Sequence, residues 1–129
     1  MKFHLQAPSL HVVTAMGPGW VRVGATEYRD NVVLLPDAVV PGWAPEGIGA
    51  LAEADFTRLL DHAPELVLLG TGERQRFFHP RLIRALAAAR IGVEVMDTRA
   101  ACRTFNILVA EDRRVAAALI VCEEPVAAP

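Results

Sequence analysis

The sequence has no long apolar segment and no recognisable export signal. Its longest uninterrupted apolar run, residues 115–122, is far shorter than the roughly 20 residues that a helix needs to cross a bilayer. The first residues, MKFHLQAPS, lack the apolar stretch of a secretory signal. We therefore expect no membrane span and a cytoplasmic location.

An excess of basic residues is also missing. Thirteen Lys and Arg residues stand against fifteen Asp and Glu residues, and the net charge is −2. A protein that neutralises nucleic-acid phosphates needs a concentrated basic surface. Nucleic acid is therefore not expected as a partner.

The residue patterns of metal sites and of common nucleophiles are absent. Cys102 and Cys122 form no CxxC pair, and the four histidines include no i, i+4 pair. Ser9 is the only serine, and it lies outside a G-x-S-x-G motif. No metal, cofactor or catalytic residue is predicted, which favours a non-enzymatic role. Both cysteines are expected to be reduced and buried.

The first third of the sequence is typical of an antiparallel β-ribbon. Apolar stretches at residues 11–15, 20–23 and 27–35 are separated by short Gly-containing turns. A short strand is expected at residues 38–40. The segment that follows, residues 41–49, contains Trp43 and is too rich in Pro and Gly for a central strand, so it is predicted to be a long loop.

From Leu51 onward the pattern changes to alternating helices and strands. An amphipathic helix ends at Pro64, another begins at Pro80, and a third is capped by Asp97 or Thr98. Apolar strands are expected at residues 65–69, 93–96 and 115–121, the first two of the buried type. Glu94 interrupts the second of them, so it should lie either at a sheet edge or paired with an Arg. Two strands joined by a helix should lie parallel in one sheet.

These elements place the chain in the α/β class. We expect a layered single domain with a mixed central sheet built on a βαβαβ unit, flanked by helices and by the N-terminal antiparallel β-ribbon. Residues 1–122 form this domain, and residues 123–129 are expected to be a disordered tail. One core is predicted, and it includes the following apolar residues: Leu68, Leu86, Val95, Phe105 and Leu119.

The strongest indication of a ligand site is the loop Gly70-Thr71-Gly72, which follows a buried strand. Ligands of open α/β sheets bind outside the carboxyl ends of parallel strands, and glycines let backbone N–H groups approach an anion. Arg74 and Arg76 could neutralise that anion. The alternative interpretation is a tight turn with solvated arginines, because the loop matches neither GxGxxG nor a P-loop.

Asp97 and Thr98 should emerge at the same edge of the sheet as this loop and share one cleft with it. Alternatively, either residue caps the third helix, and capping is compatible with ligand binding. Asn106 lies further along that helix. It either contacts a partner or satisfies a buried backbone group.

Four segments of the chain resemble a family of small α/β proteins of bacteria and archaea whose mitochondrial relative is an assembly factor for respiratory complex I. The resemblance extends from about Leu10 to Val121 and is carried by residues 68–72, 92–98, 101–108 and 111–115. It implies a layered fold with a mixed central sheet. It also implies a non-catalytic role in the assembly of respiratory or protein-export machinery.

Two function classes remain open at this point. The first is a protein-interaction or assembly module that docks a partner through an exposed apolar surface around Trp43 and residues 41–49. The second is a small-molecule or anion binder, or an enzyme, that uses the Gly70-Thr71-Gly72 and Asp97-Thr98 loops. An edge strand of the N-terminal ribbon could also support a homodimer.

Overall fold

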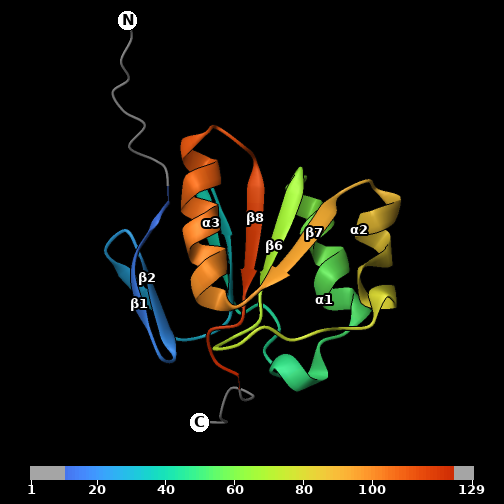
Figure 1. The fold of residues 1–129 in the computed structure, drawn as a ribbon, viewed down its shortest axis with the longest axis horizontal. Helices are drawn as coiled ribbons and strands as arrows, with labels where there is room; N and C mark the ends of the chain where they lie inside the picture. Colours follow the sequence, from blue (N-terminus) through green and yellow to red (C-terminus); the bar gives the residue numbers. More distant parts are fainter. Residues whose placement is uncertain (1–10, 124–129) are drawn as a thin grey trace, which may run out of the picture.

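The computed structural model describes residues 11–123 and contains two β-sheets, one of which forms the centre of the molecule (Figure 1). This central sheet has the strand order β5-β4-β8-β6-β7. Its strands are β4 (Val32–Leu35), β5 (Ala38–Pro41), β6 (Leu66–Gly70), β7 (Gly92–Met96) and β8 (Val115–Leu119). The smaller antiparallel sheet consists of β1 (Val13–Gly17), β2 (Trp20–Val23) and β3 (Thr26–Tyr28).

Strands β6, β7 and β8 are parallel neighbours, as the alternation of helices and strands predicts. The crossover from β6 to β7 contains the short helices η3 (Pro80–Ile83) and α2 (Arg84–Ala88), and α3 (Thr98–Ala110) joins β7 to β8. Strands β4 and β5 add to the same sheet in antiparallel orientation, so the sheet is mixed. The remaining short helices, η1 (Ile48–Ala50), α1 (Glu53–Thr57) and η2 (Arg58–His62), connect β5 to β6. The fold class is therefore confirmed.

Two predicted strands differ from the structure. The predicted strand at residues 27–35 is interrupted at residues 29–31, so that β3 pairs in the small sheet and β4 in the central one. Asn31 is buried, and its side-chain Oδ1 accepts hydrogen bonds from the N–H groups of Val121 and Cys122. Residues 93–96 are only partly buried, unlike the buried strand predicted there, and of the two positions considered for Glu94 the sheet edge is the correct one. Strand β7 lies at the edge of the sheet, and Glu94 is exposed there.

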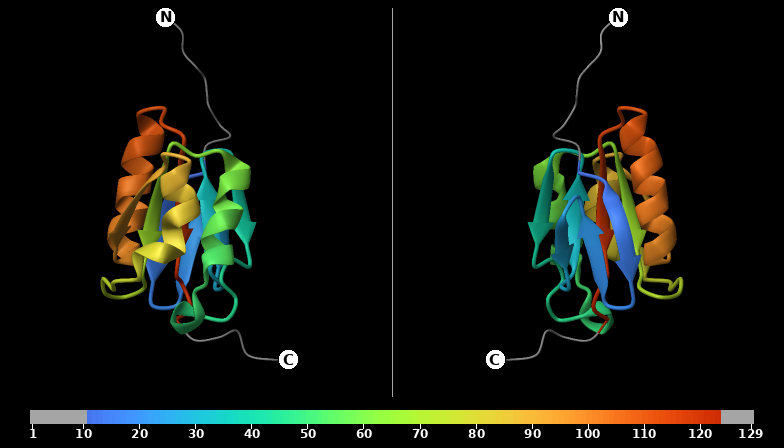
Figure 2. Two further views of the ribbon diagram at one scale, coloured as in Figure 1. Left: turned by 90° about the vertical axis from the view of Figure 1, so that its right-hand side faces the viewer. Right: turned by 90° about the vertical axis from the view of Figure 1, so that its left-hand side faces the viewer.

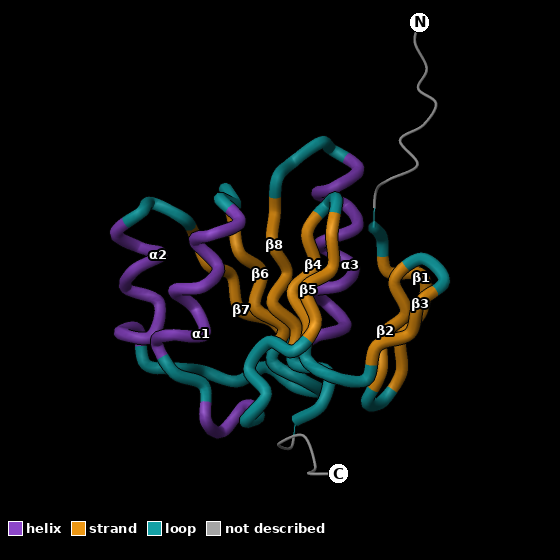
Figure 3. Tube along the Cα trace, turned by 180° about the vertical axis from the view of Figure 1, so that it is seen from behind, coloured by secondary structure: helices purple, strands orange, loops and turns teal. Residues whose placement is uncertain are grey.

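The domain has three layers, which the two side views and the reverse view show (Figures 2 and 3). Helices α1 and α2 cover one face of the central sheet, whereas α3 and the small β-sheet cover the other. A β-strand directs successive side chains to opposite faces. For example, Val33 faces the α1–α2 layer, and its neighbours Val32 and Leu34 face α3 and the small sheet.

The sheet therefore separates two cores, and the prediction of a single core is wrong. Leu68, Phe105 and Leu119 pack together on the α3 face. Leu86 and Val95 belong to the opposite core, beneath α1 and α2. All five are apolar, but sequence alone does not show which face of a doubly covered strand each one occupies.

The side chain of Trp43, the aromatic residue of the predicted docking surface, is buried, although other residues of the loop such as Pro45 and Glu46 are exposed. Trp43 is only 4% exposed, and its ring packs edge-on against Phe56 with the ring centroids 5.8 Å apart. Its indole N–H donates to the carbonyl oxygen of Asp55 at 2.9 Å. Trp43 thus anchors the loop after β5 to the core, and its own side chain offers no surface to a partner.

Within residues 11–123, no helix is long and apolar enough to span a bilayer. The segment predicted to be a disordered tail begins at Glu123. Glu123 is described, and its carboxylate makes specific contacts that are given below. Residues 124–129 lie outside the described part of the chain.

Candidate functional site: a cleft beside the ends of β6 and β8

The loops that follow β6 and β7 meet directly at one edge of the central sheet. The N–H of Thr98 donates to the carbonyl oxygen of Gly72 at 2.9 Å, and the N–H of Gly72 donates to Oγ1 of Thr98 at 2.8 Å. Parallel strands place their carboxyl ends at the same edge, which is why these two loops lie together. The structure therefore brings Gly70-Thr71-Gly72 and Asp97-Thr98 into one cluster.

The hydroxyl groups of this cluster are fully used within the chain. Oγ1 of Thr98, besides accepting from Gly72, donates to the carbonyl oxygen of Ile120 at 2.7 Å and so ties the end of β8 to both loops. Oγ1 of Thr71 donates to the carbonyl oxygen of Arg74 at 2.7 Å and accepts from the N–H of Arg76 at 3.1 Å. Both threonines are buried. They hold the turn together and are not available to a ligand.

A carboxylate of the chain itself occupies the position predicted for an anion. Glu123 accepts a hydrogen bond from the N–H of Glu73 at 2.9 Å and pairs with the Arg76 guanidinium, also at 2.9 Å. Gly72 has a φ of 99°, and a Cβ there would lie 2.5 Å from the carboxylate of Glu123. The glycine is needed both for its backbone conformation and for this close approach.

The other predicted site residues have distinct positions. Arg74 is exposed and makes no ion pair among the described residues. Asp97 caps α3, because its Oδ1 accepts from the N–H of Ala100 at 2.8 Å. Asn106 binds both backbone groups of Val13, each at 2.9 Å, and thereby fixes β1 against α3. Of the two interpretations of Asn106, its contacts match the backbone-satisfying one.

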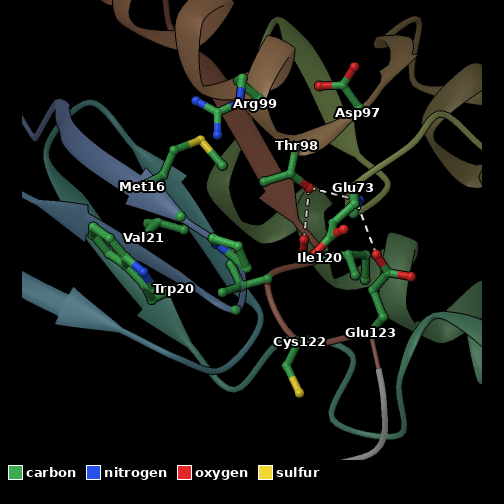
Figure 4. A pocket seen from close by; sticks show the side chains of 15 residues that line it. Met16, Trp20, Val21, Glu73, Asp97, Thr98, Arg99, Ile120, Cys122 and Glu123 are labelled. Atoms are coloured by element: carbon green, nitrogen blue, oxygen red, sulfur yellow. Dashed lines mark hydrogen bonds between the residues drawn. The ribbon is translucent and has the colours of Figure 1, made fainter.

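A cleft of about 700 Å³ lies between the β1–β2 hairpin and this cluster (Figure 4). The hairpin supplies one wall, with Met16 and Trp20, and the start of α3 supplies another, with Asp97 and Arg99. The segment after β8 supplies residues 120–123. A volume of this size is within the range of about 300–1,000 Å³ that is typical of ligand sites.

Of the residues predicted from the sequence, three line the cleft: Gly72, Asp97 and Thr98. Five do not: Gly70, Thr71, Arg74, Arg76 and Asn106.

Sequence reasoning did not identify the hairpin residues Met16 and Trp20 or the charged residues Arg99 and Glu123 as part of a site. The signal for the hairpin was present, because Trp20 directly follows the turn Gly17-Pro18-Gly19 and a large aromatic there has little room in a core. The packing of that hairpin beside the start of α3 depends on tertiary structure, which the local pattern does not contain.

The charged groups of the cleft differ in whether they are paired. Glu123 is neutralised by Arg76, whereas Glu73, Asp97 and Arg99 make no ion pair among the described residues. Three lining carboxylates and one lining guanidinium give the cleft an acidic balance.

Cys102 lies close behind this region, in the α3 core. Burial raises the pKa of its thiol to about 12, so the thiol is protonated at neutral pH and is a poor nucleophile. Within residues 11–123, no group of three His, Cys, Asp or Glu side chains is arranged to hold a metal ion.

Fold and site define a small α/β domain with a mixed five-stranded sheet, a β-ribbon and a cleft between that ribbon and α3. The family model described as "Protein of unknown function (DUF498/DUF598)" matches residues 13–120. The chain belongs to this family.

Similar curated proteins include a eukaryotic assembly factor. The mouse protein named NADH dehydrogenase (ubiquinone) 1 alpha subcomplex assembly factor 3 is 40% identical over 90 residues, which cover 68% of this chain and 48% of the relative. The chain thus spans about half the length of that relative. A Francisella tularensis protein named 13 kDa major membrane protein is 33% identical over 117 residues, which cover 90% of this chain and 94% of the relative.

Solved structures show the same fold. A crystal structure of a Bordetella parapertussis protein is 38% identical, has a TM-score of 0.81, and is matched over 89% of this chain and 98% of that one. A solution structure from Bordetella pertussis, described as an Mth938-like domain, is 31% identical with a TM-score of 0.80, and the match covers 98% of this chain and 96% of that one.

Proposed function

We propose that this chain is a non-catalytic protein-interaction domain that assists the assembly of a respiratory complex. The observation that carries the proposal is the 40% identity, over 68% of the chain, to a relative named as an assembly factor of NADH dehydrogenase. The chain spans about half of that relative, so an NADH dehydrogenase as its client is part of the proposal.

The cleft supports this proposal. It presents an aromatic wall and charged groups of both signs, a combination that is common at the centres and rims of protein interfaces. Its backbone donors and hydroxyls are mostly satisfied within the chain, as the contacts of Thr71 and Thr98 show. Such a surface is preformed, so binding a partner would require little ordering of the cleft itself.

Cross-linking in the source cells tests the proposal. The chain would be tagged, cross-linked in growing cells and purified, and the cross-linked proteins would be identified by mass spectrometry. We expect subunits or assembly intermediates of the membrane NADH dehydrogenase to be enriched over a tag-only control. Deletion of the gene should also lower NADH oxidation by isolated membranes. No enrichment together with unchanged oxidation would refute the proposed function.

A second candidate function is the binding of a small molecule in the same cleft, because Gly72, Asp97 and Thr98 line a hollow of ligand size. A thermal-shift screen with nucleotides, sugar phosphates and small carboxylates tests it. A ligand at 100 times its dissociation constant adds about 2.7 kcal/mol to the free energy of unfolding, which a melting curve detects easily. A flat screen would leave only the interaction role.

Two further properties belong to the proposal. We place the protein in the cytoplasm, although the Francisella relative is named a membrane protein. Fractionation of cells with a salt wash of the membranes checks this location. A homodimer would form through the exposed edge of β3, since Asn106 already binds the backbone of Val13 at the β1 edge. Light scattering at several concentrations would detect it.

A further inference from the structure

We propose that the cleft binds an extended peptide segment of a partner protein, in which a basic side chain lies next to an apolar one. This inference rests on the proposed function and adds the site and the chemistry of the partner to it. Three features of the cleft favour this occupant: its aromatic wall, its charge balance and its hydrogen-bonding groups.

The aromatic wall is formed by Trp20, which lies across from Gly17 in the hairpin, on the opposite face of the ribbon from Met16 (Figure 4). The indole of Trp20 lies against Gly17, where a Cβ would come within 2.6 Å of Nε1 and 2.9 Å of Cε2. The ring is therefore held in place by the backbone of its own hairpin, yet it is only half-buried. A fixed and partly exposed indole suits an apolar side chain, and its face also attracts a cation.

The charge balance favours a basic side chain on the opposite side. Glu73 and Asp97 line the cleft without ion pairs among the described residues, and Arg76 already neutralises Glu123. One oxygen of Asp97 caps α3, which leaves its second oxygen without a hydrogen bond among those residues. Two unpaired carboxylates against the single guanidinium of Arg99 leave an excess of negative charge that a Lys or Arg side chain would complement.

The hydrogen-bonding groups distinguish a peptide from a simple amine. The indole N–H of Trp20 and the exposed guanidinium of Arg99 are donors that have no hydrogen-bond acceptor within residues 11–123. Peptide carbonyl groups accept such bonds, and a polyamine has no acceptor to offer. A segment with a basic side chain and an apolar neighbour therefore satisfies the acidic side, the aromatic wall and the donors together.

The cleft is already formed in the free chain. The ion pair between Glu123 and Arg76, together with the bond from Thr98 to Ile120, fixes the segment after β8 that lines the cleft. A preformed site avoids part of the entropy that is lost when a flexible surface becomes ordered on binding.

Titration with short peptides, followed by NMR of the ¹⁵N-labelled chain, tests the inference. The probes are acetylated and amidated pentapeptides with a central Arg flanked by Leu, Val, Phe or Ala, and the same peptides with Glu or Gln at the centre. Trp20 and Trp43 supply the two indole N–H signals, which a Trp20→Phe variant assigns. We expect Arg peptides with large apolar flanks to shift the Trp20 signal in a saturable way and to leave that of buried Trp43 unchanged.

Two double variants test whether the carboxylates of the cleft bind the Arg side chain of the peptide. Glu73→Gln combined with Asp97→Asn removes two carboxylates of the cleft while Asn retains a helix-capping oxygen. Glu94→Gln combined with Glu111→Gln removes two exposed carboxylates that do not line the cleft. The cleft pair should weaken binding of the Arg peptides about tenfold, and the matched pair should leave it within twofold.

Several results would overturn the inference. These are the absence of any Trp20 shift with the whole peptide panel at millimolar concentration, equal binding of the Glu-centred peptides, and binding of spermidine or arginine amide as tight as that of the peptides. In the cross-linking experiment, partners recovered equally with the Glu73→Gln/Asp97→Asn chain would refute the cleft and leave the proposed function intact. No enrichment with the unaltered chain, together with unchanged NADH oxidation after gene deletion, would instead refute the proposed function.

Discussion

Replacing Thr98 with Val should destabilise the domain more than removing a solvent-exposed hydroxyl would. Val has nearly the same shape, but it lacks the hydroxyl that accepts from Gly72 at 2.8 Å and donates to Ile120 at 2.7 Å. Both partner groups belong to buried residues, and Thr98 itself is only 4% exposed. Each buried polar group left without a partner costs about 1–3 kcal/mol. We expect Thr98→Val to lower the free energy of unfolding by roughly 2–4 kcal/mol.

Urea unfolding monitored by fluorescence measures this change, and an unaltered slope would show that the comparison is between similar folded states. Thr98→Ser is the matched control, because it retains the hydroxyl and loses only a methyl group. Its cost should be about 1 kcal/mol. If Thr98→Val cost less than about 1 kcal/mol, or no more than Thr98→Ser, the hydroxyl would not be the link between the two loops and β8.

Three more predictions concern the core, a buried thiol and the internal anion. Phe105→Ala should lower the free energy of unfolding by about 3–5 kcal/mol, because Phe105 is fully buried. Ile107 lies on the same helix but is 54% exposed, so Ile107→Ala should change that free energy by no more than about 0.5 kcal/mol. Equal costs of the two substitutions in urea unfolding would contradict the packing. Because burial raises the pKa of Cys102 from 9.0 to about 12, stability should fall by about 1.4 kcal/mol per pH unit as pH rises above 9, and Cys102→Ala should lack this loss. Glu123→Gln removes the ion pair with Arg76, so it should lower the free energy of unfolding by less than about 1 kcal/mol. It should also increase the rise in melting temperature that sulfate produces, because the loop is then open to an external anion. An unchanged response to sulfate would show that the loop binds no external anion.

The sequence predicts best those features that depend on neighbouring residues. The helix that begins after Asp97 was expected because an acceptor side chain precedes an amphipathic run, and Asp97 does accept from Ala100. The parallel pairing of β6 and β7 followed from two apolar strands joined by a short helix. In both cases the cause lies within a segment of about 30 residues, which is the length of one βαβ unit.

Features that depend on distant partners were missed. The break between β3 and β4 comes from Asn31, whose buried side chain binds Val121 and Cys122 at the far end of the chain. Likewise, Trp43 in a Pro- and Gly-rich loop looked like an exposed aromatic residue, but Phe56 and Asp55 provide a place for it in the core. A local sequence pattern shows that a residue is apolar or carries a side-chain amide. It does not show which distant element will pack over that residue.

The loop after β6 shows how such a partner changes a functional interpretation. Its backbone N–H at Glu73 and the guanidinium of Arg76 do bind a carboxylate, as the glycines and arginines indicate, but the carboxylate is that of Glu123, about fifty residues away in the chain. A tethered group of this kind acts at a high effective concentration, so a free anion would have to displace it. The cleft groups left for an outside molecule are the indole N–H of Trp20, the carboxylate of Glu73, the second oxygen of Asp97 and the guanidinium of Arg99. Their chemistry is that of a site for a cation and its apolar neighbour, which is why the cleft supports recognition of a basic peptide better than the anion site that the loop alone suggested.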